Sequence, residues 1–217
     1  MHDPGSDLLL FMICSPSGAG KTTLTRDLLQ TFDQLTFSVS CTTRKPRPGE
    51  VDGRDYFFIA RDEFMRRVQL GAFLEWAEVH GNLYGTSLSE LDRARAEGKA
   101  GIVFDVDYQG ARQIKAKLPS TAGIFILPPS MDELARRLRG RNTDDESTIQ
   151  RRIAKAKVEI ENYRLFDYLI VNDELGKSQA RLRSIVYAEA SRCPRMALSA
   201  ERLLREESVG TWPFQPL

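Results

Sequence analysis

Residues 15–24 read SPSGAGKTTL and combine small residues with one lysine and two threonines. If a helix begins here, the backbone N–H groups of residues 18–21 lack helical partners and can point at an anion. Lys21 would then reach the β- and γ-phosphates of a nucleotide, and the Thr22 hydroxyl would ligate Mg²⁺. The predicted triphosphate-binding residues are Ser15, Pro16, Ser17, Gly18, Ala19, Gly20, Lys21, Thr22 and Thr23.

The elements that must position this turn can also be predicted. The apolar run from Leu8 to Ile13 is typical of a buried strand, and Thr23 to Leu29 has the polarity pattern of a helix. Glycines let the intervening backbone adopt positive φ. The usual pattern G-x-x-x-x-G-K-[ST] begins with glycine where this chain has Ser15, so the match is incomplete. A capped surface turn is the alternative, but it does not explain a lysine and a threonine directly after Gly20.

Further along the chain, short apolar runs alternate with helical patterns: AGIVFDVD precedes QGARQIKAKL, AGIFILPP precedes MDELARRLRG, and DYLIVND precedes KSQARLRSIVYAEA. This alternation predicts an α/β fold with a parallel sheet covered by helices. Two segments do not fit the alternation. Residues 42–90, with YFFIA and FLEWAEV as expected strands, predict a small antiparallel lobe, and RGRNTDDESTIQRR is polar. Both follow strand ends, where ligands bind in such sheets.

The loop CTTRKPRPGEVDGRDY predicts a second phosphate site. Arg44 and Arg47 lie in a segment stiffened by prolines, so ordering their guanidinium groups costs little entropy, and Tyr56 adds a hydroxyl. A solvated basic loop is the alternative.

The stretch FLEWAEVHGNLYGTS predicts which base the site accepts. The Glu75 carboxylate can accept hydrogen bonds from both N1–H and the N2 amine of guanine, whereas adenine presents an acceptor at N1 and would be repelled. Tyr84 and Thr86 follow in the same stretch.

The order and spacing of these segments resemble the guanylate kinases. SPSGAGKTTL, SVSCTTRKPRPGEVDGRDY, FLEWAEVHGNLYGTS, FDVDYQGARQIK, IFILPPS, RRLRGRNTDD and YLIVND carry the resemblance from about Leu8 to about Glu189, and the bacterial single-domain enzymes are the most similar. The resemblance implies a P-loop nucleoside-monophosphate-kinase fold in three layers. Its domain would span residues 1–190, with a core (8–41 and 98–190), a mixed or antiparallel GMP-binding lobe (about 42–90) and a helical lid (about 137–155), before a C-terminal extension (191–217).

The implied reaction is ATP + GMP giving ADP + GDP, with Mg²⁺, as part of purine nucleotide metabolism; use of dGMP stays open. Carried over by position, the GMP phosphate is held by Arg44, Arg47, Tyr56 and Tyr84. Guanine is held by Ser40, Glu75, Thr86 and Asp107. The lid supplies Arg137, Arg141 and Arg152 to the ATP phosphates, and Asn172 approaches adenine. With Lys21, Arg44 and these three lid arginines, the site would concentrate positive charge on the transferring group.

Several of these residues have simpler interpretations. A charged helix surface is the alternative for the lid arginines, and a helix cap for Asn172. Asp105 and Asp107 end the buried run GIVFDVD, where a carboxylate can orient Mg²⁺ or its waters. We expect these two acids to point to opposite sides of the strand and so to divide the work, and we assign Asp105 to the metal and Asp107 to guanine.

Composition excludes some functions. The 217-residue chain has 31 basic and 30 acidic residues, so no overall charge favours nucleic acid or an anionic membrane. Three cysteines without C-x-x-C spacing and the lack of an apolar stretch of about 20 residues predict a cytoplasmic protein.

Whether the tail docks on the protein body or on a sister subunit, forming a homo-oligomer, stays open. The rival functions are a guanylate-kinase-like binding module and a related kinase acting on a phosphorylated sugar.

Overall fold

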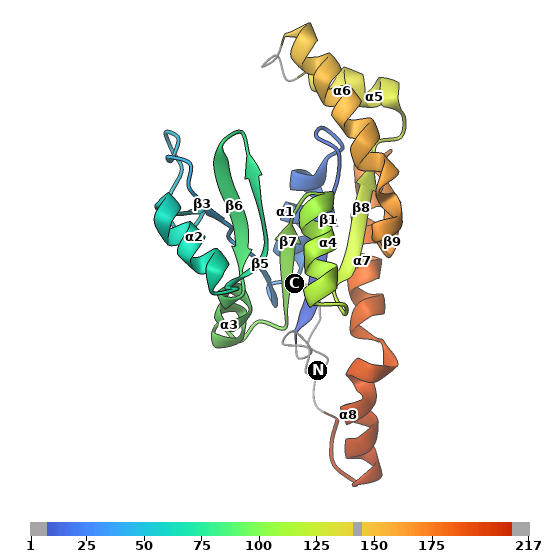
Figure 1. The fold of residues 1–217 in the computed structure, drawn as a ribbon. Coiled ribbons are helices and arrows are strands. Elements are labelled where there is room, and N and C mark those ends of the chain that lie inside the picture. The colour runs from blue at the N-terminus through green and yellow to red at the C-terminus, as the bar shows by residue number, and fades with distance from the viewer. Residues whose placement is uncertain (1–7, 141–144, 210–217) are drawn as a thin grey trace. The chain divides into compact units, whose positions relative to one another are not determined.

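The computed structural model describes residues 8–140 and 145–209. The chain forms two compact units. The first unit contains the residues up to Cys14 together with Thr36–Gly123, and the second contains Ser15–Leu35 together with the chain from Ile124 onwards. Helices and strands alternate through most of the chain (Figure 1), as the sequence predicts.

The strands are, in chain order, β1 (Leu9–Cys14), β2 (Leu35–Phe37), β3 (Cys41–Thr42), β4 (Phe57–Phe58), β5 (Phe73–Val79), β6 (Asn82–Ser87), β7 (Gly101–Asp105), β8 (Ala122–Leu127) and β9 (Tyr168–Val171). The helices are α1 (Lys21–Thr31), α2 (Arg61–Gln69), α3 (Ser89–Ala96), α4 (Tyr108–Lys117), α5 (Met131–Arg139), α6 (Glu146–Glu161), the short 3₁₀ helix η1 (Tyr163–Leu165), α7 (Leu175–Ala190) and α8 (Cys193–Leu204).

The first unit contains parallel pairing and a mixed sheet. All six residues of β1 are buried, and β1 pairs in parallel with β7, from Leu9 opposite Gly101 to Ile13 opposite Asp105. This confirms the prediction of a strand buried on both faces. The second sheet has the order β4-β3-β6-β5, with β6 antiparallel to both its neighbours and β4 parallel to β3.

The hairpin β5–β6 forms most of this second sheet. His80 and Gly81 join its strands at φ 51° and 78°, which is the left-handed conformation that a tight hairpin turn requires. α2 covers the sheet through Phe64, whose ring stacks on that of Phe73 with centroids 4.4 Å apart. The helix and this sheet therefore share an apolar cluster of Cys41, Phe64, Phe73 and Leu83.

The sequence run FSVSCTT, residues 37–43, contains the end of one strand and the whole of the next. β2 ends at Phe37 and β3 begins at Cys41. Between them, Ser38 N–H donates to the Val103 carbonyl at 3.0 Å and Val39 N–H donates to the buried Glu90 carboxylate at 2.7 Å. These bonds satisfy the backbone while the chain leaves one sheet for the other, which a pattern of apolar residues cannot reveal.

The second unit contains the pairing of β8 with β9, which is parallel from Ile124 opposite Tyr168. α1 and α7 are joined by a two-pronged ion pair between Arg183 and Asp27, with N–O distances down to 2.7 Å, and by the edge-to-face rings of Phe32 and Tyr187. These contacts fix the helix that follows the phosphate-binding loop.

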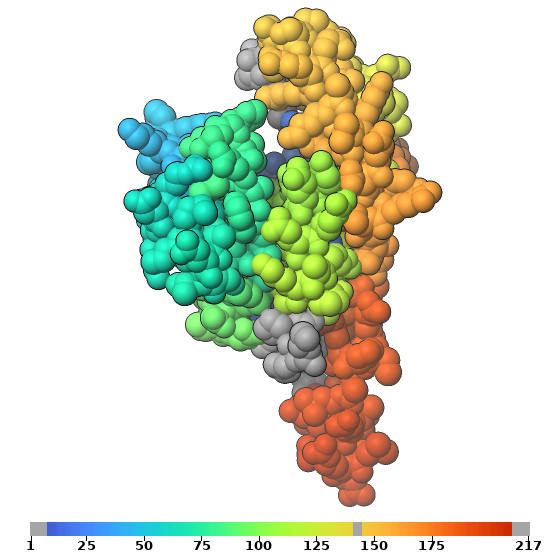
Figure 2. Space-filling model, in the orientation of Figure 1, coloured from blue at the N-terminus to red at the C-terminus, as the bar shows by residue number. Residues whose placement is uncertain are grey.

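α5 and α6 lie side by side in Figure 1 and share a cluster of Leu134, Leu138, Ile149 and Ala156. In Figure 2 much of α6 lies on the molecular surface, and only three of its 16 residues are buried. α8 has no buried residue. Within the described residues, no helix has both the length and the apolar character needed to cross a membrane.

Candidate functional site

The predicted phosphate-binding loop lies in the second unit, and α1 begins directly after it at Lys21. Gly18 and Gly20 have φ values of 95° and 102°, so both adopt the left-handed conformation expected of them. One expected anion donor differs: Ala19 N–H donates to the Pro16 carbonyl at 3.1 Å and closes the turn. Ser15 is half-buried, and its hydroxyl donates to the same carbonyl at 3.1 Å.

Close packing behind the loop leaves little space for a side chain at either glycine, which is a second reason for glycine at these positions. A Cβ on Gly18 would lie 3.1 Å from side-chain atoms of both Leu134 and Leu138 of α5. A Cβ on Gly20 would lie 2.2 Å from the amide nitrogen of Asn172. Neither leucine was among the residues predicted for the site.

Asn172 and Arg137 meet at one carbonyl of this loop. Asn172 is buried, and its Nδ2 donates to the Ala19 carbonyl at 2.7 Å. Arg137 Nη1 reaches the same oxygen at 3.5 Å, while Nη2 donates to the Asn172 carbonyl at 3.0 Å. The helix-cap alternative for Asn172 is wrong, because Glu174 occupies the N-cap position of α7.

Some other basic residues of this unit pair with carboxylates on the surface, and others are the arginines predicted to contact the ATP phosphates. Glu133 accepts hydrogen bonds from Arg136 and from Arg137, which together lower the pKa of its carboxyl to about 2. Arg136 is a surface residue. Arg152 lies on α6 and is half-buried, and Arg141 lies outside the described residues. Glu133, which orients Arg137, was not predicted; its spacing of four residues on a helix is the signal that was available.

The predicted GMP residues lie in the first unit, and five of the eight line a cavity of about 190 Å³. Ser40, Tyr56, Glu75, Tyr84 and Asp107 of the predicted set line it. The other lining residues are Ala77, Val79, Asp105 and Val106. Thr86 lies behind the carboxylate and donates its hydroxyl to Glu75 Oε1 at 2.7 Å.

The electrostatics of this cavity are dominated by Glu75, which is only 8% exposed. Burial raises the pKa of its carboxyl above the ordinary range and the nearby charge of Asp107 adds to the rise, while the hydrogen bond from Thr86 opposes it. Gly110 of α4 allows this approach, since a Cβ there would lie 3.1 Å from Glu75 Oε2. Gly110 was not predicted. A buried acid of this kind is suited to accept hydrogen bonds from a neutral donor such as guanine.

The two acids at the end of β7 line one cavity, so the expectation that they point to opposite sides was wrong. Side chains two positions apart on a strand lie on the same face, and Asp107 lies two positions beyond Asp105, where β7 ends, with both residues lining the same cavity. Asp107 is the N-cap of α4: its Oδ1 accepts from Gln109 N–H at 3.0 Å and from Gly110 N–H at 2.9 Å. Its other oxygen is a further acceptor for a ligand.

The arginine loop is held by a residue that sequence reasoning missed. Glu50 Oε1 accepts from Arg44 Nη2 at 2.8 Å, and its Oε2 accepts from Arg47 N–H at 2.7 Å. The Arg44 side chain lowers the pKa of the Glu50 carboxyl, and the Arg47 backbone bond adds to the effect. The Arg44 guanidinium also lies 5.4 Å from the Tyr56 ring centroid and 5.8 Å from that of Phe58. Arg44 is thus oriented, whereas the Arg47 residue is exposed.

The predicted metal residues supply hard oxygen ligands. Thr22 is exposed in the first turn of α1, and Asp105 is exposed at the end of β7. Over residues 8–140 and 145–209, no group of three or more His, Cys, Asp or Glu side chains forms a metal cage. Each of the two residues, taken by itself, offers the kind of oxygen that Mg²⁺ accepts, and Mg²⁺ keeps several waters and binds together with nucleotide phosphates.

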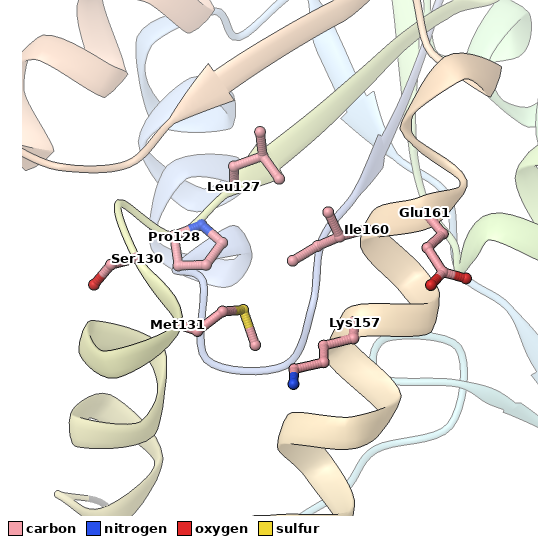
Figure 3. Close-up of a pocket in the computed structure, with 7 residues that line it drawn as sticks. All are labelled: Leu127, Pro128, Ser130, Met131, Lys157, Ile160 and Glu161. Carbon is pink, nitrogen blue, oxygen red and sulfur yellow. The ribbon is translucent and has the colours of Figure 1, made fainter.

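A second cavity, of about 460 Å³, lies at the foot of the α5–α6 pair (Figure 3). Leu127, Pro128 and Met131 line one side, and Lys157 and Ile160 of α6 line the other. It contains none of the residues predicted to bind nucleotide.

A phosphate-binding loop between a strand and a helix of an α/β fold, together with an acidic cavity in the other unit, defines a P-loop nucleotide-binding protein. The chain belongs to the guanylate kinase family: the family model described as guanylate kinase matches residues 9–189. It is 50% identical to a guanylate kinase of Geobacter sulfurreducens over 188 residues, which cover 87% of this chain and 92% of that protein. It is 52% identical to one of Nitratidesulfovibrio vulgaris over 186 residues, covering 86% and 89%.

The fold agrees with this family. The crystal structure of guanylate kinase from Anaplasma phagocytophilum superimposes with a TM-score of 0.68 at 34% identity, covering 87% of this chain and 89% of that one. The α/β nucleoside-monophosphate-kinase fold expected from the sequence is therefore confirmed.

Proposed function

We propose that this chain is a transferase that phosphorylates GMP with ATP, giving GDP and ADP. The observation that carries the proposal is the buried Glu75 in the first unit's cavity, with a raised pKa and a hydroxyl donor behind it. An ionised acid in such a place is costly unless a ligand supplies donors, and guanine supplies two on one edge. Curated relatives at about 50% identity carry the same activity in their names.

The residues of the second unit would bind the donor. Backbone N–H groups of the loop and the positive end of α1 attract the phosphates, and Lys21 adds a charge at the β- and γ-positions. Arg137, Arg152 and Arg141 would contribute further positive charge during transfer.

The residues of the first unit would bind the acceptor. Arg44, Arg47, Tyr56 and Tyr84 take the GMP phosphate, and the acids of the cavity take the base. An oxygen of that phosphate attacks the γ-phosphorus, the bond from that phosphorus to the β-bridging oxygen breaks, and ADP leaves. Since the attacking oxygen is already largely ionised near neutral pH, positioning and charge, without a general base, account for catalysis.

Mg²⁺ would bind with ATP, held by the Thr22 hydroxyl and assisted by Asp105. When bound, it neutralises phosphate charge.

We further propose that the domain divides into a core (8–41 and 98–190), a lobe (42–90) and a lid (137–155). Closure of the lobe and the lid would exclude water from the phosphates. The buried free thiols Cys14 and Cys41 suit a reducing cytoplasm. Whether the chain forms a homo-oligomer can be measured by light scattering.

The test is ADP release from ATP and Mg²⁺ with GMP, AMP, UMP or a sugar phosphate as acceptor. We expect turnover with GMP alone and its loss in Lys21→Met, whereas Lys45→Met, which changes an exposed lysine, should behave as wild type. Turnover with a sugar phosphate would indicate the sugar-phosphate kinase. GMP binding without turnover on any acceptor would indicate a binding module.

A further inference from the structure

The side chain of Asn172 is directed at the phosphate-binding loop itself. Its Nδ2 donates to the Ala19 carbonyl at 2.7 Å, and only 6% of the residue is exposed. Its backbone is held as well, because Asn172 N–H donates to the Leu127 carbonyl at 2.8 Å at the end of the β8–β9 pair. A rigid parallel pair therefore presents this amide to the loop.

Holding the Ala19 carbonyl determines where the next N–H points. In a planar trans peptide the C=O and the following N–H are antiparallel, so a carbonyl pulled toward Asn172 turns Gly20 N–H to the opposite side. Ala19 stands between two glycines in left-handed conformations, a segment with little conformational preference of its own. The amide of Asn172 thus supplies the direction that the two glycines leave undetermined.

The contact is also tight. A Cβ at Gly20 would lie 2.2 Å from Asn172 Nδ2, so the amide occupies the space beside the loop. Arg137 joins the same group, with Nη2 on the Asn172 carbonyl at 3.0 Å and Nε on Glu133 at 2.8 Å. One residue after β9 therefore holds both the loop and an arginine predicted to contact phosphate.

We propose that Asn172 is a positioning residue of the phosphate-binding loop, which sets the Ala19–Gly20 peptide for the donor phosphates and acts independently of the donor's base. This inference deepens the proposed function and rests on it. It differs from the expectation that this residue approaches adenine, because the amide nitrogen donates to the Ala19 carbonyl of the loop.

The test compares ligands that share phosphates and differ in the base. Binding of ATP, ITP and inorganic tripolyphosphate is measured by calorimetry for wild type, Asn172→Ala and the isosteric Asn172→Asp. We expect Asn172→Ala to weaken all three by a similar factor of about ten, and Asn172→Asp to weaken them more, since a carboxylate then faces a carbonyl and an anionic ligand. Turnover measured with ATP and ITP should fall by matching factors.

The matched control is Asn162→Ala, which removes another Asn amide that donates to a carbonyl, that of Val158 at 2.8 Å, in the same unit. It should leave all three affinities unchanged. A loss confined to ATP, with tripolyphosphate and ITP binding retained, would overturn the inference in favour of adenine contact. Thermal melts establish that each variant folds, and the isosteric variant keeps the buried volume. Because tripolyphosphate binding needs no GMP, a wild type that binds it without GMP turnover would refute the proposed function and leave this inference standing.

Discussion

Replacing Glu75 with glutamine alters the buried acid of the GMP cavity while keeping its shape. The carboxylate offers two acceptor oxygens to guanine, but the amide keeps one and turns a donor toward a donor. Loss of one hydrogen bond to a buried charged group costs about 1.5–3 kcal/mol. With Glu75 only 8% exposed, little solvent screening reduces this cost, and kcat/KM for GMP should fall roughly 10- to 150-fold.

The pH dependence gives a second readout. Burial raises the pKa of Glu75, so guanine recognition should weaken as pH falls through that raised value, and the variant should lack this step. For stability the sign is opposite: the neutral acid is favoured in the folded state, so its contribution is present below the ordinary pKa and lost as pH rises through the raised one. Glu75→Gln should therefore be at least as stable as wild type at pH 8.

The assay is steady-state turnover with GMP and with IMP, which lacks the N2 amine, from pH 5 to 8. The control is Glu78→Gln on the same strand, whose side chain is 51% exposed and paired with Arg61. A kcat/KM for GMP within threefold of wild type, or an unchanged ratio of GMP to IMP, would refute the reading of Glu75 as the base-recognising acid.

Two residues that contact predicted GMP-binding residues give further predictions. Gly110→Ala should gain up to about 1 kcal/mol of helix stability yet raise the KM for GMP, because the new Cβ would lie 3.1 Å from Glu75 Oε2; a lower melting temperature with unchanged KM would contradict this. Glu50→Gln should raise the KM for GMP with little change in the KM for ATP, since Arg44 loses its charged partner, and Asp55→Asn in the same loop serves as the control.

Local patterns predicted much of this molecule. The strand, turn and helix around the phosphate-binding loop follow from an apolar run, two glycines and a polar periodicity, and all are close in sequence. Glu75 could be singled out because the chemistry of a guanine edge calls for an acid, and the structure shows that acid buried. Residue type carried these predictions because the relevant neighbours lie within a few positions.

The remaining contacts are between distant segments. Asn172 and Ala19 are separated by 153 positions, and no periodicity links an asparagine to a carbonyl that far away. The expectation that Asp105 and Asp107 point to opposite sides was wrong because residues two positions apart on a strand share a face. Gly110 looked like an ordinary helical glycine until its approach to Glu75 was seen.

The division of the chain has a consequence for how such a protein can change over generations. The described residues predicted to bind ATP all lie in Ser15–Leu35 or after Ile124, and those predicted to bind GMP all lie in Thr36–Gly123. A lineage can therefore acquire a new acceptor through substitutions confined to one unit, while the inherited donor machinery stays intact. Chimaeras that exchange residues 36–123 between relatives should accordingly transfer acceptor preference without donor preference.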